Sequence, residues 1–260
     1  MKVVIVLLTL LSAQCLHATI QRSDPCIIDK DTMYIDMYES WDILYGPFRE
    51  VLSKNVNPRH LRSDCFRGYI GSWTLKDSLF YLEDIKTDVG SENLNKTFES
   101  ISKRSFTQNG LLADWITGTI YVGIEMGVPW VHVYEMALHI KEGKLIGLEE
   151  FGSREPPIGI SYAARNRFLY QGIDKNALNE RTESDLFYVQ IHVAREGVLD
   201  SISLIQFDST STLHKQLVEN LKSLNYWGQC FYKGEAIAYE RSMFTSTSKK
   251  SRRQRIRILR

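Results

Sequence analysis

Short runs of β-branched and aromatic residues, separated by polar turns, recur along this chain and limit the folds that it can adopt. Residues 67–75 and 79–82 are two such runs, and Lys76-Asp77-Ser78 between them is typical of a β-hairpin turn. Further strand-like runs follow at residues 115–122, 131–140 and 145–148, and a turn is predicted at Glu142-Gly143 between the last two. We therefore predict a mostly β, aromatic-rich domain over residues 19–165.

The first part of this domain, residues 19–62, is expected to be partly helical. Met33, Met37, Trp41 and Leu44 recur at spacings of four, four and three residues, which places them on one face of a helix. We expect this face to be buried in the core of the domain.

Residues 1–18 have the features of a cleaved secretory signal peptide. Lys2 gives a positive start, residues 3–11 are apolar apart from Thr9, and the following residues are small or polar. The apolar run is about half of the roughly 20 residues that cross a bilayer as a helix. We therefore predict no retained transmembrane helix and an exported mature chain, either periplasmic or secreted.

Three cysteines remain after the predicted cleavage: Cys26, Cys65 and Cys230. An oxidising compartment permits disulfides, and Cys26–Cys65 is the natural pair because it would fix the start of the mature chain. No pair of cysteines has the CxxC spacing of redox and zinc sites. The hydrophobic core must therefore carry the fold.

Residues 186–247, which follow a loop-rich connector at residues 166–185, have the clearest organisation. The predicted elements are a strand, a strand, a helix and a strand, at residues 187–194, 198–207, 213–224 and 236–245. Leucines recur every three or four residues in the helix, and residues 208–212 offer oxygens to cap it. We therefore predict an α+β protein, with a mostly β first unit and a small ββαβ second unit.

This second unit shows further features in a fixed order. They are Val189-Gln190-Ile191-His192-Val193, Glu196-Gly197, residues 202–206, Ser209, residues 213–224, Trp227, Gly234 and residues 236–244. Their order resembles the C-terminal domain of the TonB energy-transducer family, over roughly a quarter of the chain. In that family the domain docks an extended peptide of an outer-membrane receptor by strand addition. The resemblance implies a protein or peptide partner in the envelope, bound through Trp227, Ala236, Ile237, Tyr239 and Arg241.

The chain also departs from the TonB pattern. Gly228-Gln229-Cys230 follows Trp227, where family members usually carry a proline. The whole chain has 6 prolines, so it lacks the long proline-rich spacer with which a transducer reaches across the periplasm. We therefore predict a non-enzymatic binding protein rather than an energy transducer.

A secreted hydrolase or binder of cell-wall or extracellular glycan is the alternative function, and it would use the first unit. Asp114 and Glu135 would be the carboxylate pair for acid–base work on the glycan. These residues belong to phrases that resemble uncharacterised bacterial envelope proteins, which implies a compartment but no activity. The phrases are Arg67-Gly68-Tyr69-Ile70-Gly71-Ser72-Trp73, Leu112-Ala113-Asp114-Trp115-x-Thr117-Gly118 and Val131-His132-x-Tyr134-Glu135.

Metal and cofactor sites are not predicted. His132, Glu135 and His139 would share one face of a helix, but the surrounding residues favour a strand, in which the two histidines face opposite sides. The sequence has no phosphate loop, dinucleotide fingerprint or nucleophile elbow.

Residues 248–260 form a basic tail that contains no acidic residue. Its charges would attract an anionic envelope surface through Lys249, Lys250, Arg252, Arg253, Arg255 and Arg257. A solvated, frayed terminus is the other interpretation. Nucleic acid is not expected as a partner.

Overall fold

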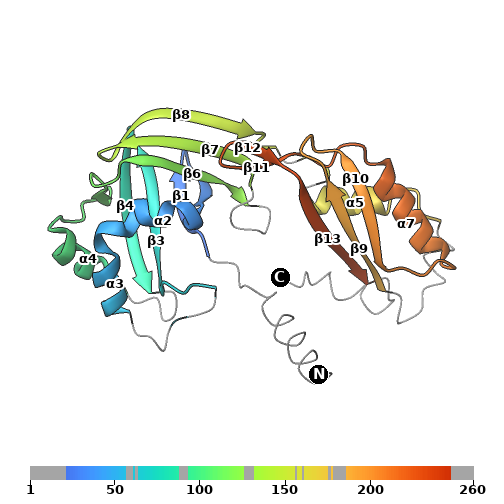
Figure 1. Cartoon of the computed structure of the whole chain (residues 1–260), viewed down its shortest axis with the longest axis horizontal. Coiled ribbons are helices and arrows are strands. Elements are labelled where there is room, and N and C mark those ends of the chain that lie inside the picture. The colour runs from blue at the N-terminus through green and yellow to red at the C-terminus, as the bar shows by residue number, and fades with distance from the viewer. Residues whose placement is uncertain are drawn as a thin grey trace, which may run out of the picture. The chain divides into compact units, whose positions relative to one another are not determined.

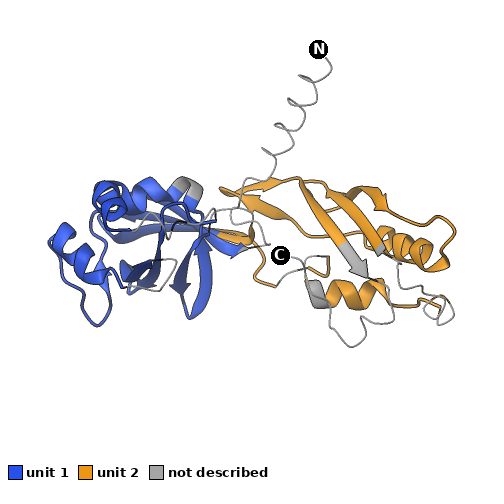
Figure 2. Ribbon diagram, turned by 90° about the horizontal axis from the view of Figure 1, so that it is seen from below, with its two compact units in different colours: residues 1–130, 136–149 blue, residues 131–135, 150–260 orange. Residues whose placement is uncertain are grey.

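The structure is a computed structural model, and it describes residues 22–56, 61, 64–87, 93–125, 132–155, 157–159, 161–174, 177 and 186–246 (Figure 1). The chain divides into two compact units (Figure 2). Unit 1 comprises residues 1–130 and 136–149, and unit 2 comprises residues 131–135 and 150–260. The division falls inside two strands, earlier in the chain than the predicted connector.

Seven strands, including the two that the division between the units crosses, close into a β-barrel (Figure 1). In chain order they are β1 Asp24–Ile28, β2 Asp31–Ile35, β3 Tyr69–Lys76, β4 Leu79–Thr87, β6 Gly118–Glu125, β7 His132–Lys141 and β8 Lys144–Gly152. Around the barrel the order is β1-β3-β4-β8-β7-β6-β2, and β2 pairs with β1. The pairing of β4 with β8, where Leu79 lies opposite Lys144, completes the closed sheet.

Tight two-residue turns join several neighbouring strands. Both turn residues have positive φ at Asp29-Lys30, Asp77-Ser78, Glu142-Gly143 and Lys233-Gly234. This is the type I′ conformation, whose twist matches that of the strands it joins. The turns predicted between residues 75 and 79 and at Glu142-Gly143 are thereby confirmed.

Short helices connect the barrel strands. They are α2 Met37–Tyr45, the 3₁₀ helix η1 Gly46–Phe48, α3 Arg49–Asn55 and α4 Asn95–Ser102. The predicted helical stripe is only partly correct, because Met33 belongs to β2 and α2 begins at Met37. Met33, Met37 and Leu44 are nevertheless buried. An apolar side chain on a strand can therefore continue the buried stripe of the helix that follows it.

Unit 2 contains a three-stranded sheet with the order β10-β9-β13. The strands of this sheet are β9 Leu186–Val193, β10 Leu199–Gln206 and β13 Tyr239–Ser246. The same unit contains the helices α5 Tyr162–Leu169 and α7 Thr212–Ser223. Phe187, Val189 and Ile191 alternate along β9 and are buried, as are Leu213 and Leu217 of α7. The predicted amphipathic helix is confirmed, and the side chain of Ser211 caps it by accepting from the N–H of His214 at 3.3 Å.

Three further strands belong to the larger sheet: β5 Leu111–Leu112, β11 Cys230–Tyr232 and β12 Glu235–Ile237. Strands β11 and β12 form a hairpin, and Phe231 of β11 lies opposite His132 at the start of β7. This hairpin lies between α7 and β13 in the chain, so the small sheet is not formed by consecutive elements.

The predicted fold class is therefore wrong. Over its described residues the protein is mostly β, with a closed seven-stranded barrel, three extra strands, a small sheet and few helices, and these residues form no ββαβ unit. The predicted closing strand at residues 236–245 is two strands, which separate at Ala238 and join different sheets. Neither glycine nor proline marks this break in the sequence.

Candidate functional site

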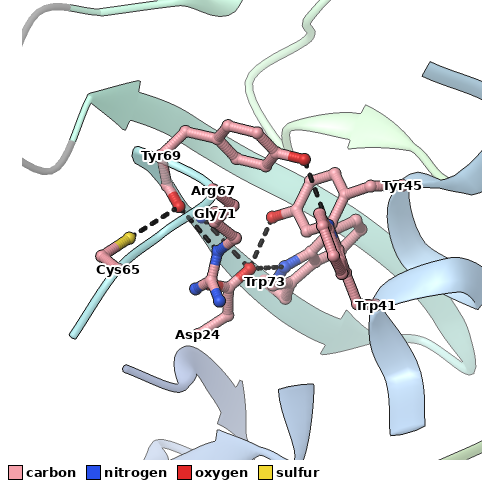
Figure 3. Close-up of polar contacts among 8 residues, drawn as sticks. All are labelled: Asp24, Trp41, Tyr45, Cys65, Arg67, Tyr69, Gly71 and Trp73. Carbon is pink, nitrogen blue, oxygen red and sulfur yellow. Dashed lines mark hydrogen bonds and ion pairs between the residues drawn. The ribbon is translucent and has the colours of Figure 1, made fainter. Parts of the chain in front are cut away.

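Asp24, the first residue of β1, holds its carboxylate in a buried site surrounded by donors (Figure 3). The guanidinium of Arg67 pairs with Oδ1. Oδ2 accepts from the hydroxyl of Tyr45 at 2.5 Å and from the indole N–H of Trp73 at 3.1 Å. It also accepts from the backbone N–H of Gly71 at 3.2 Å. These hydrogen bonds offset the loss of water around a buried charge.

Gly71 permits this close arrangement because it has no side chain. A Cβ at this position would lie 2.0 Å from the hydroxyl oxygen of Tyr45, 2.9 Å from Nε1 of Trp73 and 3.0 Å from Oδ2 of Asp24. The indole of Trp73 is fixed in turn by stacking on Phe80, with ring centroids 5.2 Å apart. The backbone of β3 can therefore reach the carboxylate only if residue 71 is glycine.

Arg67 connects the buried carboxylate to a neighbouring cavity. Its Nε donates to the carbonyl oxygen of Tyr69 at 2.7 Å, and its side chain is 3% exposed. Burial, the largest single effect, lowers the pKa of Arg67, but Asp24, Tyr45, Cys65 and Tyr69 together raise it more, so the net pKa lies above the ordinary value. The guanidinium therefore carries its charge beside the cavity.

The cavity has a volume of about 560 Å³, and α2, α3 and the chain around residues 66–69 form its walls. Trp41, Phe66 and Tyr69 give it aromatic walls. Phe66 meets Trp41 edge to face at a centroid distance of 5.1 Å, and the guanidinium of Arg49 lies 4.4 Å from the centre of the Trp41 ring. Such a cavity suits a ligand with one flat apolar face and a negative group.

Tyr69 supplies a neutral hydroxyl to the same wall. The indole N–H of Trp41 donates to this hydroxyl at 3.2 Å. Burial raises the pKa of Tyr69 to about 12, so the hydroxyl keeps its proton at neutral pH. Arg49, which also lines the cavity, is exposed and pairs with Asp42 at 3.6 Å.

The two edges of the small sheet differ in regularity. Strand β13 pairs with β9 through eight consecutive residue pairs, from Tyr239 opposite Val193 to Ser246 opposite Leu186. Strand β10, at the other edge, has a register irregularity near each end of its pairing with β9. Irregularities of this kind bend an edge strand and obstruct further pairing. The regular edge is therefore β13.

A polar network crosses all three strands of the small sheet. Nε2 of His192 lies 3.1 Å from Oγ of Ser203, and Nδ1 of His192 lies 3.0 Å from Oε1 of Glu240. The amide of Gln190 donates to Oε2 of Glu240 at 2.5 Å. The network thus links one residue of β10, two of β9 and one of β13.

The residues predicted to bind a partner are not gathered on one surface. Trp227 is fully buried, so its ring packs inside unit 2. Ala236 and Ile237 lie on β12, at the edge of the larger sheet, whereas Tyr239 and Arg241 lie on β13. Only the β13 part of the predicted edge belongs to the small sheet.

Asp114 and Glu135, the predicted carboxylate pair, lie in different units and have other partners. Asp114 pairs with Nε of Arg104 at 2.6 Å and is partly exposed. Glu135 is buried, accepts from the backbone N–H of Gly234 at 2.5 Å and lies 2.9 Å from Nδ1 of His132. Both carboxylates are therefore engaged in structural contacts.

The predicted disulfide partners, Cys26 and Cys65, are buried thiols in this structure. Burial raises the pKa of Cys26 far above its ordinary value. The sulfur of Cys65 lies 3.6 Å from the carbonyl oxygen of Tyr69. Among the described residues, no group of three or more His, Cys, Asp or Glu side chains is arranged to hold a metal ion.

Sequence reasoning missed both clusters. Asp24 lies in a stretch for which no strand was predicted, although its partners Arg67, Gly71 and Trp73 belong to one of the phrases quoted for the first half. The network of His192, Ser203, Gln190 and Glu240 depends on the register of three strands, which the spacing of residues along the chain does not reveal.

Two sequence predictions fall outside the described residues. They are the signal peptide of residues 1–18 and the basic tail with Lys249, Lys250, Arg252, Arg253, Arg255 and Arg257. Within the described part of the chain, none of the helices has the length and apolar character that a bilayer crossing requires.

No protein-family model, no curated protein and no solved structure matches this chain.

Proposed function

We propose that this exported protein binds an extended peptide segment of a cell-envelope protein, which adds as a strand beside β13. The apolar run at residues 3–11 favours export, and the order of sequence features in residues 186–247 resembles a peptide-docking domain, although the described part of this segment forms no ββαβ unit. Strand addition uses the backbone N–H and C=O groups that an edge strand leaves unpaired, and pockets for alternate side chains add specificity.

The regularity of β13 is the observation that carries this proposal. Its eight pairs with β9 contain no irregularity, so its outer edge presents evenly spaced backbone groups over the length of an ordinary strand. Among the described residues β13 is the last strand of its sheet and pairs with β9 alone. The irregular edge strand β10 offers no comparable template.

The side chains of β13 suggest which peptide would fit. Glu240 and Ser242 are exposed and lie on the same face of the sheet, because they are two residues apart. Met243, on the opposite face, is buried. Residues directly opposite each other on paired strands interact, and opposite charges attract. We therefore expect the bound peptide to carry lysine or arginine beside Glu240 and apolar residues on its other face.

The experiment is selection of displayed random peptides on the chain that starts at Thr19, followed by hydrogen exchange with the selected peptide bound. The expected result is slower exchange of backbone amides within residues 239–246. Binding that leaves these amides unchanged, or that slows β10 instead, contradicts strand addition at β13.

Proline variants test the same edge with a matched control. Backbone N–H groups along a strand point alternately to its two sides. Proline has no N–H, so one of the variants Arg241→Pro and Ser242→Pro removes a hydrogen bond to β9, and the other keeps all of them. That variant should retain the thermal midpoint and lose peptide binding. Ser201→Pro and Ile202→Pro on β10 are the controls, and the better-folded of the two should still bind.

An acidic saccharide bound in the cavity beside Arg67 is a second candidate function. The stacked pair of Arg49 and Trp41 favours it, because a sugar ring packs on aromatic faces while a guanidinium pairs with its carboxylate. The described surface has a similar pair, Arg104 over Trp115 at 5.5 Å, which serves as a control.

Calorimetric titration with cell-wall fragments containing muramic acid tests this candidate. Arg49→Gln should abolish the binding heat, and Arg104→Gln should not change it. Equal loss in both variants, or no heat with the unmodified chain, removes the candidate.

A further inference from the structure

Ser203, His192 and Glu240 lie side by side on three neighbouring strands, β10, β9 and β13. The imidazole of His192 is the central group, with Nε2 3.1 Å from Oγ of Ser203 and Nδ1 3.0 Å from Oε1 of Glu240. Each ring nitrogen therefore has a different partner, a hydroxyl on one side and a carboxylate on the other. The three groups in contact are therefore, in order, a hydroxyl, an imidazole and a carboxylate.

The carboxylate decides which ring nitrogen is available as a base. Glu240 can only accept from Nδ1–H, so the lone pair of neutral His192 lies on Nε2 and faces Ser203. The amide of Gln190 donates to the other oxygen of Glu240 at 2.5 Å, which fixes the orientation of the carboxylate. A base oriented in this way by a third group activates a serine hydroxyl as a nucleophile.

We infer that Ser203, His192 and Glu240 form a nucleophilic triad that accepts the acyl group of small carboxylic esters. The inference does not depend on peptide binding at β13. Access to the triad comes from solvent, because the side chain of His192 is 27% exposed and that of Glu240 is 58% exposed. His192 and Glu240 also line a cavity of about 520 Å³.

The cavity that His192 and Glu240 line also contains one cation, Arg195, and two further carboxylates, Glu196 and Asp200, whereas Ser203 does not line it. The described residues therefore supply a nucleophile and an oriented base.

The reaction proceeds in two balanced halves. Oγ of Ser203 bonds to the ester carbonyl carbon, and its proton passes to Nε2 of His192. When the tetrahedral adduct collapses, the bond from the carbonyl carbon to the alkoxy oxygen breaks, and the departing oxygen takes that proton. In the second half, Nε2 accepts a proton from water as the water oxygen attacks the acyl carbon. Collapse of this adduct returns the proton to Oγ and releases the carboxylic acid.

p-Nitrophenyl acetate is the test substrate, and release of nitrophenolate by the chain from Thr19 is the measured rate. Ser203→Ala and His192→Gln should each lower the rate by about a hundredfold, a typical loss for removal of an activated nucleophile or its base. Ser201→Ala is the matched control, since Ser201 is an exposed serine on the same strand, directly opposite His192. Its rate should equal that of the unmodified chain.

Glu240 acts as a positioning residue, so its test is the pH profile. Glu240→Gln should change the pH dependence of the rate because it removes the carboxylate that holds Nδ1–H, whereas a purely structural role would leave the profile unchanged.

Labelling of the unmodified chain with a fluorophosphonate provides a test that needs no variant. Mass spectrometry should locate the label on Ser203. A label spread over several serines, or a Ser203→Ala rate within about twofold of the Ser201→Ala rate, would overturn the inference.

Discussion

The guanidinium of Arg67 pairs with the carboxylate of Asp24 in a site closed to water, with side-chain exposures of 3% and 0%. The residues are 43 positions apart, on the two parallel strands β1 and β3 or just before them. Removal of the cation leaves a buried, unpaired carboxylate. We therefore expect Arg67→Met to lower the free energy of unfolding by about 3–5 kcal/mol, measured by urea denaturation.

A double variant distinguishes the loss of the ion pair from the loss of side-chain packing. Asp24→Asn combined with Arg67→Met removes both charges, so the double variant should be more stable than the sum of the single losses predicts. Lys54→Met, which removes an exposed pair with Glu50, should leave the unfolding curve nearly unchanged. Additive losses in the double variant would show that the two charges do not interact.

Gly71→Ala should destabilise the barrel by about 1–3 kcal/mol, because the new methyl group overlaps the hydroxyl of Tyr45. Thermal unfolding measures the loss. Addition of Tyr45→Phe removes that hydroxyl and should recover part of it. Gly46→Ala is the control, since nothing lies within 4 Å of a Cβ at that position. Equal effects at both glycines would contradict the steric explanation.

Alkaline pH should destabilise the protein. Burial raises the pKa of Tyr69 from 10.0 to about 12 and that of Cys230 from 9.0 to about 12. A group whose pKa is raised by folding contributes its full stability below its unfolded pKa and loses it as pH rises toward the folded pKa. The thermal midpoint should therefore be flat from pH 7 to about 9 and fall from there to about 12.

The Cys230→Ser variant isolates one part of this dependence. Its thermal midpoint should fall less steeply between about pH 9 and 10, where the thiol but not the tyrosine begins to titrate in the unfolded chain. A slope identical to that of the unmodified chain would show that Cys230 does not contribute.

Thiol counting distinguishes the buried thiols from the predicted disulfide. Because Cys26, Cys65 and Cys230 are buried, a thiol reagent should react slowly with the folded chain from Thr19. After denaturation without reductant it should detect all three thiols. Detection of a single thiol would instead establish a disulfide.

Trp227→Ala should lower the stability of the folded chain, because Trp227 belongs to the core. The indole is fully buried, and its removal leaves a large cavity, so the expected loss is about 3–5 kcal/mol in the free energy of unfolding. Urea denaturation measures this loss. Weaker peptide binding without a loss of stability would instead place Trp227 at the interface.

The sequence was informative where the signal is local. Runs of β-forming residues around Asp77-Ser78 and Glu142-Gly143 predicted two hairpins because turn chemistry and strand propensity agree there. The amphipathic stripe and the oxygens before Leu213 predicted α7 and its cap for the same reason. Closure of the barrel could not be predicted, because the pairing of β4 with β8 leaves no pattern among neighbouring residues of the sequence.

The candidate sites were harder to predict because they join distant residues. Asp24 meets Arg67 only after β1 and β3 have paired, and the strand character of residues 24–28 was hidden by the helical spacing that begins at Met33. His192 meets Ser203 and Glu240 only through the register of both its neighbours. The break at Ala238, which divides the last strands between two sheets, has neither glycine nor proline to mark it.

The chain order of the strands determines the order in which the partners of the larger sheet are synthesised. All seven barrel strands lie between residues 24 and 152, so they are synthesised before any part of β9. Strands β11 and β12, which extend the same sheet from the start of β7, arrive only at residues 230–237. Until these strands are present, the start of β7 at His132 lacks its β11 partner, so this end of the larger sheet is completed last.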